Sequence, residues 1–230
     1  MAIGRWPSFP PVDATQWLIY FSLAGLAIGL LDKPSFRIAR SIRIGLFTLV
    51  SAGFLAALLR FKFSSGWTPA QGVAWIAALL FVILLVASSL HRLAGGTAGR
   101  PETFPLLLTA VGAGTAVAIM FSGSLLLGQL AMIFTTGTAL LCLAIWWTGT
   151  SWNETALVPV ATLIFSGLWI CGYFFADLPA ASALLLALSA PVALIARRPN
   201  PWIAPAVAAL IASIAAGIAI QGAVPMEGAY

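Results

Sequence analysis

The sequence contains few side chains that could act in catalysis or bind a ligand, and one of them is the single histidine, His91. It ends an apolar run and stands next to Arg92, which places it near a membrane surface. With no cysteine or second histidine beside it, it cannot complete a metal site. It can give one ligand to a pigment or haem if a partner chain gives the other. It can also act as an acid–base group, or simply be a polar residue at the interface.

The acidic residues all lie outside the apolar runs, at Asp13, Asp32, Glu102, Glu154, Asp177 and Glu227. Ion-coupled transporters usually keep an ionisable residue within the membrane, so this distribution argues against coupled transport. Glu154 stands where a helix is expected to begin, and a negative charge suits that end of a helix. Alone or with His91, it is also the candidate acid–base group of an enzyme acting on lipid at the cytoplasmic surface.

Other reactive groups give no recognisable motif. Cys142 and Cys171 lie inside apolar runs and lack the spacing of zinc ligands. No Ser-His-Asp set can be assembled around the single histidine, and metalloprotease and nucleotide-binding motifs are absent from the sequence. The sequence therefore predicts no catalytic residue, no metal site and no cofactor.

A set of polar residues recurs at helical spacing in two neighbouring apolar runs. Its members are Gln129, Thr136, Thr162, Ser166 and Tyr173. Two interpretations stay open. The residues line a path for a small solute, or they form hydrogen bonds within and between helices.

The amino-acid composition indicates whether these residues lie in water or in a membrane. Of the 230 residues, 61% are hydrophobic and 7% are charged, and the mean hydropathy is +1.05. Soluble domains carry about 25% charged residues, and a soluble protein with this composition would expose large apolar patches. The sequence therefore predicts an integral membrane protein.

Eight apolar runs are long enough to cross a bilayer, which takes about 17–25 residues. They cover residues 15–31, 42–61, 71–90, 104–121, 124–147, 156–176, 179–196 and 201–222. Backbone groups in hydrocarbon must satisfy one another, so each run should be a helix. The expected fold is an all-α, polytopic transmembrane helical bundle with short loops, and residues 1–230 form a single integral membrane domain.

The division within residues 104–147 depends on one short break at Ser122-Gly123-Ser124. A single helix of that length would exceed the bilayer thickness. The sequence therefore predicts two spans joined by a tight turn.

The distribution of Lys and Arg predicts the orientation. Eight of the 11 basic residues lie in the connections on one side, which the positive-inside rule assigns to the cytoplasm. Both termini then lie on the non-cytoplasmic side of a cell membrane, which in a bacterium is the inner membrane. Four of the eight, Lys33, Arg37, Arg40 and Arg43, share one connection. They are either a plain anchor or a contact site for anionic lipid or a partner protein.

Tryptophans follow the same orientation in part, because several lie near predicted helix ends, where indole rings favour the headgroup region. Trp169 is the exception, deep in the run 156–176. It is either a packing residue or part of a cavity wall.

Small residues indicate where helices approach closely. Gly25 and Gly29 form a GxxxG pattern, and Gly112, Gly114 and Ala118 are expected to form a similar small-residue face. The pattern does not distinguish a contact within the chain from a contact with another chain.

Three functions remain open from the sequence. The first is a non-catalytic integral membrane subunit or scaffold that packs against other membrane proteins. The second is a channel or uncoupled transporter for a small neutral or apolar solute, and the third is a membrane-embedded enzyme that acts on lipid. The expected partners are anionic lipids at the cytoplasmic face and other membrane subunits. Nucleic acid is not expected, because the basic residues lie in short membrane-flanking connections.

Overall fold

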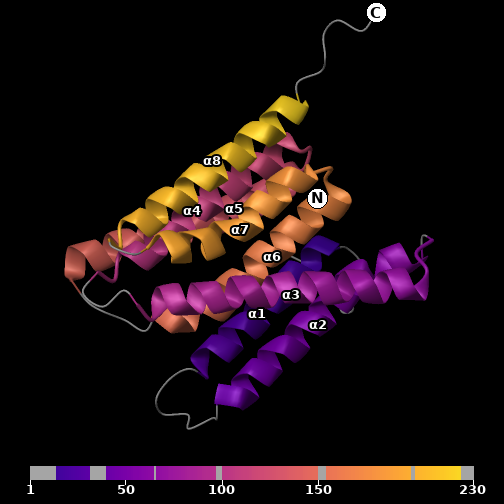
Figure 1. Cartoon of the computed structure of the whole chain (residues 1–230), viewed down its shortest axis with the longest axis horizontal. Helices are drawn as coiled ribbons and strands as arrows, with labels where there is room; N and C mark the ends of the chain where they lie inside the picture. Colours follow the sequence, from indigo (N-terminus) through magenta and orange to yellow (C-terminus); the bar gives the residue numbers. More distant parts are fainter. Residues whose placement is uncertain are drawn as a thin grey trace, which may run out of the picture.

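A computed structural model describes residues 14–31, 40–64, 66–96, 100–149, 154–197 and 200–223. These residues form eight α-helices and one short 3-10 turn, and none of them is in a β-strand (Figure 1). The helices are α1 (Ala14–Leu30), α2 (Arg40–Ser64), α3 (Pro69–Ala94), α4 (Thr103–Phe121), α5 (Leu125–Thr148), α6 (Leu157–Phe175), α7 (Ala180–Ala196) and α8 (Ile203–Ala223), and the turn η1 is Glu154–Ala156. The prediction of an all-helical bundle is confirmed.

The helix bounds follow the predicted runs closely, and the largest difference is at α3. This helix was expected over residues 71–90 and extends over Pro69–Ala94. Hydropathy marks only the part that lies in hydrocarbon, whereas the helix continues for as long as its backbone groups find partners. At its start, the Thr68 hydroxyl accepts from the Gln71 backbone N–H, and the Gln71 side chain accepts from the Thr68 N–H. This reciprocal capping box sets the beginning of α3.

Residues 104–147 form two helices, as predicted. Helix α4 ends at Phe121 and α5 begins at Leu125. Gly123 between them has φ +100°, a conformation that residues with a Cβ rarely adopt. The Ser124 hydroxyl then accepts from the Leu127 N–H and caps the start of α5.

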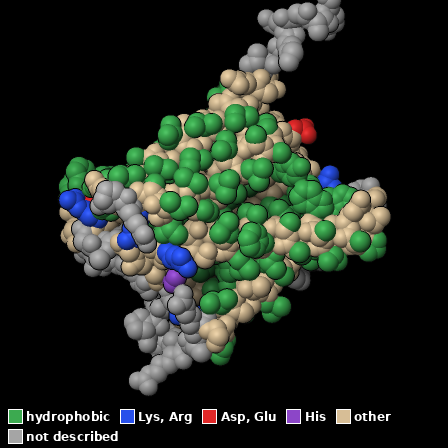
Figure 2. Space-filling view, viewed as in Figure 1, with side chains coloured by type: hydrophobic (Ala, Val, Ile, Leu, Met, Phe, Trp, Pro, Cys, Tyr) green, Lys and Arg blue, Asp and Glu red, His purple; other side chains and the backbone are tan. Residues whose placement is uncertain are grey.

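The length and composition of the helices make this a multi-pass integral membrane protein. Six helices are long and apolar enough to cross a bilayer, and the two shorter ones, α1 and α7, have 17 residues each. At 1.5 Å per residue, 17 residues rise about 25 Å, which still approaches the thickness of the hydrocarbon layer. On the face seen in Figure 2, charged side chains lie towards the ends of the molecule and apolar ones cover the middle.

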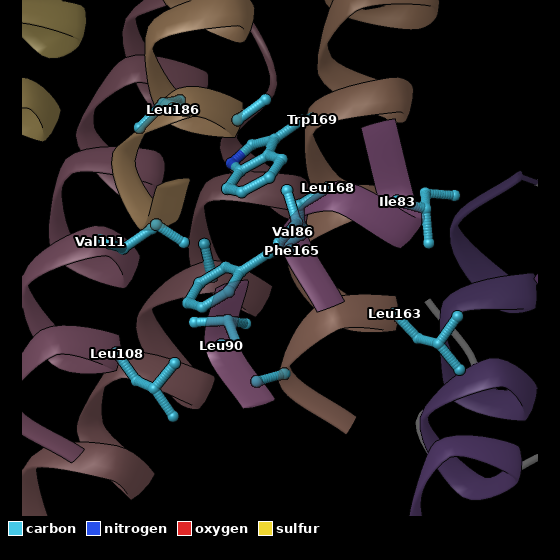
Figure 3. Packing of buried hydrophobic residues seen from close by; sticks show 14 of the residues in the cluster. Ile83, Val86, Leu90, Leu108, Val111, Leu163, Phe165, Leu168, Trp169 and Leu186 are labelled. Carbon is cyan, nitrogen blue, oxygen red and sulfur yellow. The ribbon is translucent and has the colours of Figure 1, made fainter. Parts of the chain in front are cut away.

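Helix α6 lies at the centre of the bundle. Within its apolar segment 67% of the residues are buried, against 22% for α3 and for α5. It packs against α1, α3 and α7, while α4 packs mainly between α5 and α8. The side chains of α6 therefore meet both the N-terminal and the C-terminal helices. In Figure 3, Leu163 points toward the N-terminal helices, and Phe165 and Trp169 point toward α4.

The small residues lie at contacts between helices of this chain. A Cβ on Gly25 would lie 3.0 Å from the Val160 Cα, and one on Gly29 would overlap the Ala156 carbonyl oxygen. Gly112 faces Thr135 of α5, whereas Gly114 faces α8. Gly112 and Gly114 do not share one contact, because two residues along a helix are about 200° apart around its axis.

Several hydrogen bonds also join the helices. The Thr109 and Thr138 hydroxyls lie 3.1 Å apart and link α4 to α5. The Ser182 hydroxyl donates to the Ala215 carbonyl oxygen at 2.9 Å, which links α7 to α8. At the end predicted to face the cytoplasm, the Arg197 guanidinium donates to backbone carbonyls at the end of α3, including that of Arg92 at 3.0 Å.

Candidate apolar ligand site

The polar residues predicted for the fifth and sixth spans separate into two places. Gln129 and Thr136 are exposed on the outer surface of α5, and the Thr136 hydroxyl donates to the Met132 carbonyl oxygen. Thr162 and Ser166 are buried in α6, where the Thr162 hydroxyl donates to its own helix. Gln129 and Thr136 therefore do not lie on a common surface with the α6 residues.

Of that set, Ser166 and Tyr173 line a groove that the sequence did not indicate. The groove has a volume of about 190 Å³. Its lining comes from three helices: Trp75, Leu79, Val82 and Ile83 of α3, Ser166, Trp169, Ile170, Tyr173 and Phe174 of α6, and Ala180, Ala183, Leu184 and Ala187 of α7. Its lining is almost entirely apolar, and Trp75, Tyr173 and Leu184 at its edges are partly exposed, so the groove is open at its side.

Small residues on α7 create the space. Ala180, Ala183 and Ala187 line the groove at helical spacing, opposite the large rings of Trp75 and Trp169. The alanine methyl groups are too small to fill the space that the aromatic rings leave between α3, α6 and α7. The sequence signal for this wall is a run of alanines, and such runs are common in membrane helices.

Trp169 both packs the core and forms a wall of the groove. Its ring is 5% exposed and stacks on Phe165, with 5.7 Å between the centroids and 5° between the planes. Its Nε1–H donates to the Thr115 hydroxyl at 3.0 Å, which joins α6 to α4. Trp169 is therefore both a packing residue, as Figure 3 shows, and part of the wall of the groove.

Ser166 lies at the inner part of the groove, near the middle of α6. The residue is 3% exposed, and its hydroxyl has no hydrogen-bond partner. A buried hydroxyl without a partner is unfavourable, and native proteins usually satisfy such groups. The Ser166 hydroxyl is therefore available to a polar atom that enters the groove.

Aromatic rings surround the other end of the groove, which is predicted to face outward. Trp67 and Trp75 stack with 6.0 Å between ring centroids. Both rings contact Phe174 edge to face, at 5.7 and 5.5 Å, and the Lys62 ammonium lies 6.0 Å from the centroid of the same ring. Tryptophan rings and a lysine are typical of the depth at which headgroups lie.

The candidate acid–base residues lie at the opposite end of the bundle. His91 is exposed in the last turn of α3. Glu154 is buried, with 7% of its surface exposed, in the turn η1, which packs against α1, α3 and α6. An enzyme that uses these residues stays a prediction, as does a pigment or haem at His91.

Few of the described residues are of the types that bind metal ions. Within the described ranges, His, Cys, Asp and Glu form no group of three that could hold a metal ion. Cys142 and Cys171 are free thiols on α5 and α6. The Cys142 thiol lies 3.5 Å from the Glu102 carbonyl oxygen.

The basic connection lies partly beyond the structure. Lys33 and Arg37 fall outside the described residues, while Arg40 begins α2 and Arg43 lies in its first turn. Their contact with anionic lipid or a partner protein stays a prediction.

Comparison with known proteins identifies no related protein. No protein-family model and no curated protein matches this chain. The chemistry of the groove and of the exposed helix faces is therefore the basis for assigning a function.

Proposed function

We propose that this protein is a non-catalytic membrane protein that binds the hydrocarbon chain of a lipid in the groove among α3, α6 and α7. The observation that carries the proposal is the apolar, side-open groove of about 190 Å³. An apolar cavity of about 150 Å³ is enough to bind benzene. The groove therefore has room for a segment of hydrocarbon chain.

The length of the groove supports a lipid chain as the occupant. From Ser166 to Phe174, helix α6 rises about 12 Å. One leaflet of a bilayer has about 15 Å of hydrocarbon. The groove thus extends from near the middle of the membrane to one surface, the same depth that the chain of a lipid in that leaflet covers.

Filling the groove provides the test. We expect Ala187→Phe to reduce the lipid retained by the purified protein by about tenfold. The phenylalanine ring would occupy the space of the lipid chain in the groove and remove contacts worth about 1.4 kcal/mol or more. Retained lipid is measured by native mass spectrometry in mild detergent. The matched control is Ala77→Phe, since Ala77 is exposed on α3 and does not line the groove. Equal lipid retention in both variants would contradict the proposal.

A second role, as a subunit or scaffold in a membrane assembly, is favoured by the exposed face of α5. Five of its residues follow one another at alternating spacings of three and four, and all five are exposed: Leu126, Gln129, Ile133, Thr136 and Leu140. This spacing is typical of a helix that pairs with another helix. Polar side chains on a membrane helix favour such pairing, because they form hydrogen bonds with the neighbour.

We propose a second copy of this chain as the partner of α5. The Gln129 amide both donates and accepts, so two copies can pair reciprocally across a twofold axis. We expect the wild-type protein to form dimers in liposomes and the double variant Gln129→Leu, Thr136→Val to shift the dimer–monomer equilibrium by about fivefold toward monomer. Energy transfer between labelled copies measures this shift, and Met120→Leu on α4 is the control. A wild-type monomer, or a stoichiometric foreign partner in place of the second copy, would overturn this proposal.

A further inference from the structure

We infer that the lipid held in the groove carries a net negative headgroup, which Lys62 binds at the outer end of the groove. This inference rests on the proposed function, because it assumes that a lipid chain occupies the groove. It adds the chemical class of the lipid and the residue that selects it.

The position of Lys62 is the first argument. Its ammonium lies 6.0 Å from the ring centroid of Phe174 and 5.9 Å from that of Phe175. Phe174 lines the groove, so the cation lies next to the point where a chain in the groove would leave the hydrocarbon. A lipid phosphate lies just beyond the end of its chains, and the two groups would therefore meet.

The aromatic residues beside Lys62 also indicate that this end of the groove lies at the depth of the lipid headgroups. The Trp67 backbone N–H donates to the Lys62 carbonyl oxygen at 3.4 Å, which ties the two residues together. The Trp67 ring stacks on Trp75, which lines the groove. Because indole rings favour the interface between hydrocarbon and headgroups, this end of the groove lies where phosphates are found.

The charge of the ligand follows from the charge of Lys62. A lysine ammonium binds phosphate as a compact point charge with three donors. In a zwitterionic lipid, the cationic part of the headgroup offsets that attraction. A lipid with a net negative headgroup lacks this offset, and we therefore expect it to be preferred.

Arg60 provides a matched control on the same helix. It precedes Lys62 by two residues, which places it about 200° away around α2. Arg60 is exposed, and neither of the cation–ring contacts beside the groove involves it. A general attraction between basic residues and anionic lipid would depend on both cations, whereas a site at the groove depends on Lys62.

The experiment compares two phospholipids with identical acyl chains, phosphatidylglycerol and phosphatidylcholine. The purified protein is equilibrated with an equal mixture in mild detergent, and native mass spectrometry measures the bound ratio. We expect wild type and Arg60→Gln to prefer phosphatidylglycerol by about fivefold, because one basic residue near a phosphate adds about 1 kcal/mol. Lys62→Gln should bind both lipids about equally, and Lys62→Arg should restore the preference.

The outcomes separate this inference from the proposed function. If wild type binds both lipids equally, or if Lys62→Gln keeps the preference, the headgroup inference is overturned. If lipid retention is unchanged when Ala187→Phe fills the groove, the proposed function fails instead. Loss of the preference in Arg60→Gln as well as in Lys62→Gln would indicate a general surface charge and would also overturn the inference.

Discussion

Replacing Gly29 with leucine is expected to separate α1 from α6 and to lower the free energy of unfolding by about 3 kcal/mol. A Cβ at Gly29 would overlap the Ala156 carbonyl oxygen, and one at Gly25, one turn earlier, would lie 3.0 Å from the Val160 Cα of α6. The atoms that a larger side chain would meet belong to the backbone, and they cannot move aside by adopting another rotamer as a side chain can. The two helices must therefore move apart along their whole contact, and the close packing that holds helices together in lipid is lost.

Unfolding in mixed micelles with increasing SDS measures this effect. Gly53→Leu on α2 is the matched control, because a Cβ at Gly53 has nothing within 4 Å. That variant should be as stable as wild type or slightly more stable, since leucine favours helix over glycine by about 1 kcal/mol. A Gly29→Leu protein with wild-type stability would show that α1 does not pack on α6 in this way.

Shortening Trp169 to alanine is expected to lower the free energy of unfolding by about 2–3 kcal/mol, which is less than the about 3–5 kcal/mol typical of this change in the core of a soluble protein. The ring stacks on Phe165 and is 5% exposed, so its removal leaves a cavity beside the groove. Helices that separate within a bilayer remain in hydrocarbon, and the transfer part of the usual cost is therefore small. The loss of packing contacts remains.

A second variant separates the ring from its hydrogen bond. Trp169→Phe keeps most of the ring but loses the bond to the Thr115 hydroxyl, which should cost about 1 kcal/mol. Trp146→Ala is the control, because that side chain is 76% exposed on α5 and should contribute little. The same SDS titration compares the three proteins. Equal losses in Trp169→Ala and Trp169→Phe would mean that the hydrogen bond, and not the packing of the ring, stabilises this part of the core.

The amino-acid sequence alone was enough to predict the helices. A bilayer of given thickness requires apolar runs of a narrow range of lengths, and the backbone within them must be helical. For this reason the eight runs match α1 to α8, and the short break at Gly123 was sufficient to divide α4 from α5. Hydropathy could not predict the last turn of α3, which lies beyond the apolar run and depends on capping and backbone hydrogen bonds.

The tertiary structure alone decided which face of each helix points inward. In a soluble protein, the buried face of a helix can be predicted because only that face is apolar. In lipid both faces are apolar, so the sequence pattern no longer identifies the buried one. The spacing of Gln129 and Thr136 therefore showed that they share a face, without showing that this face points away from α6. The groove depends on three helices that are distant in sequence, and on alanines of α7 that meet aromatic rings of α3 and α6. Contacts of this kind are set by how side chains of different size fit together, and a single sequence does not record that fit.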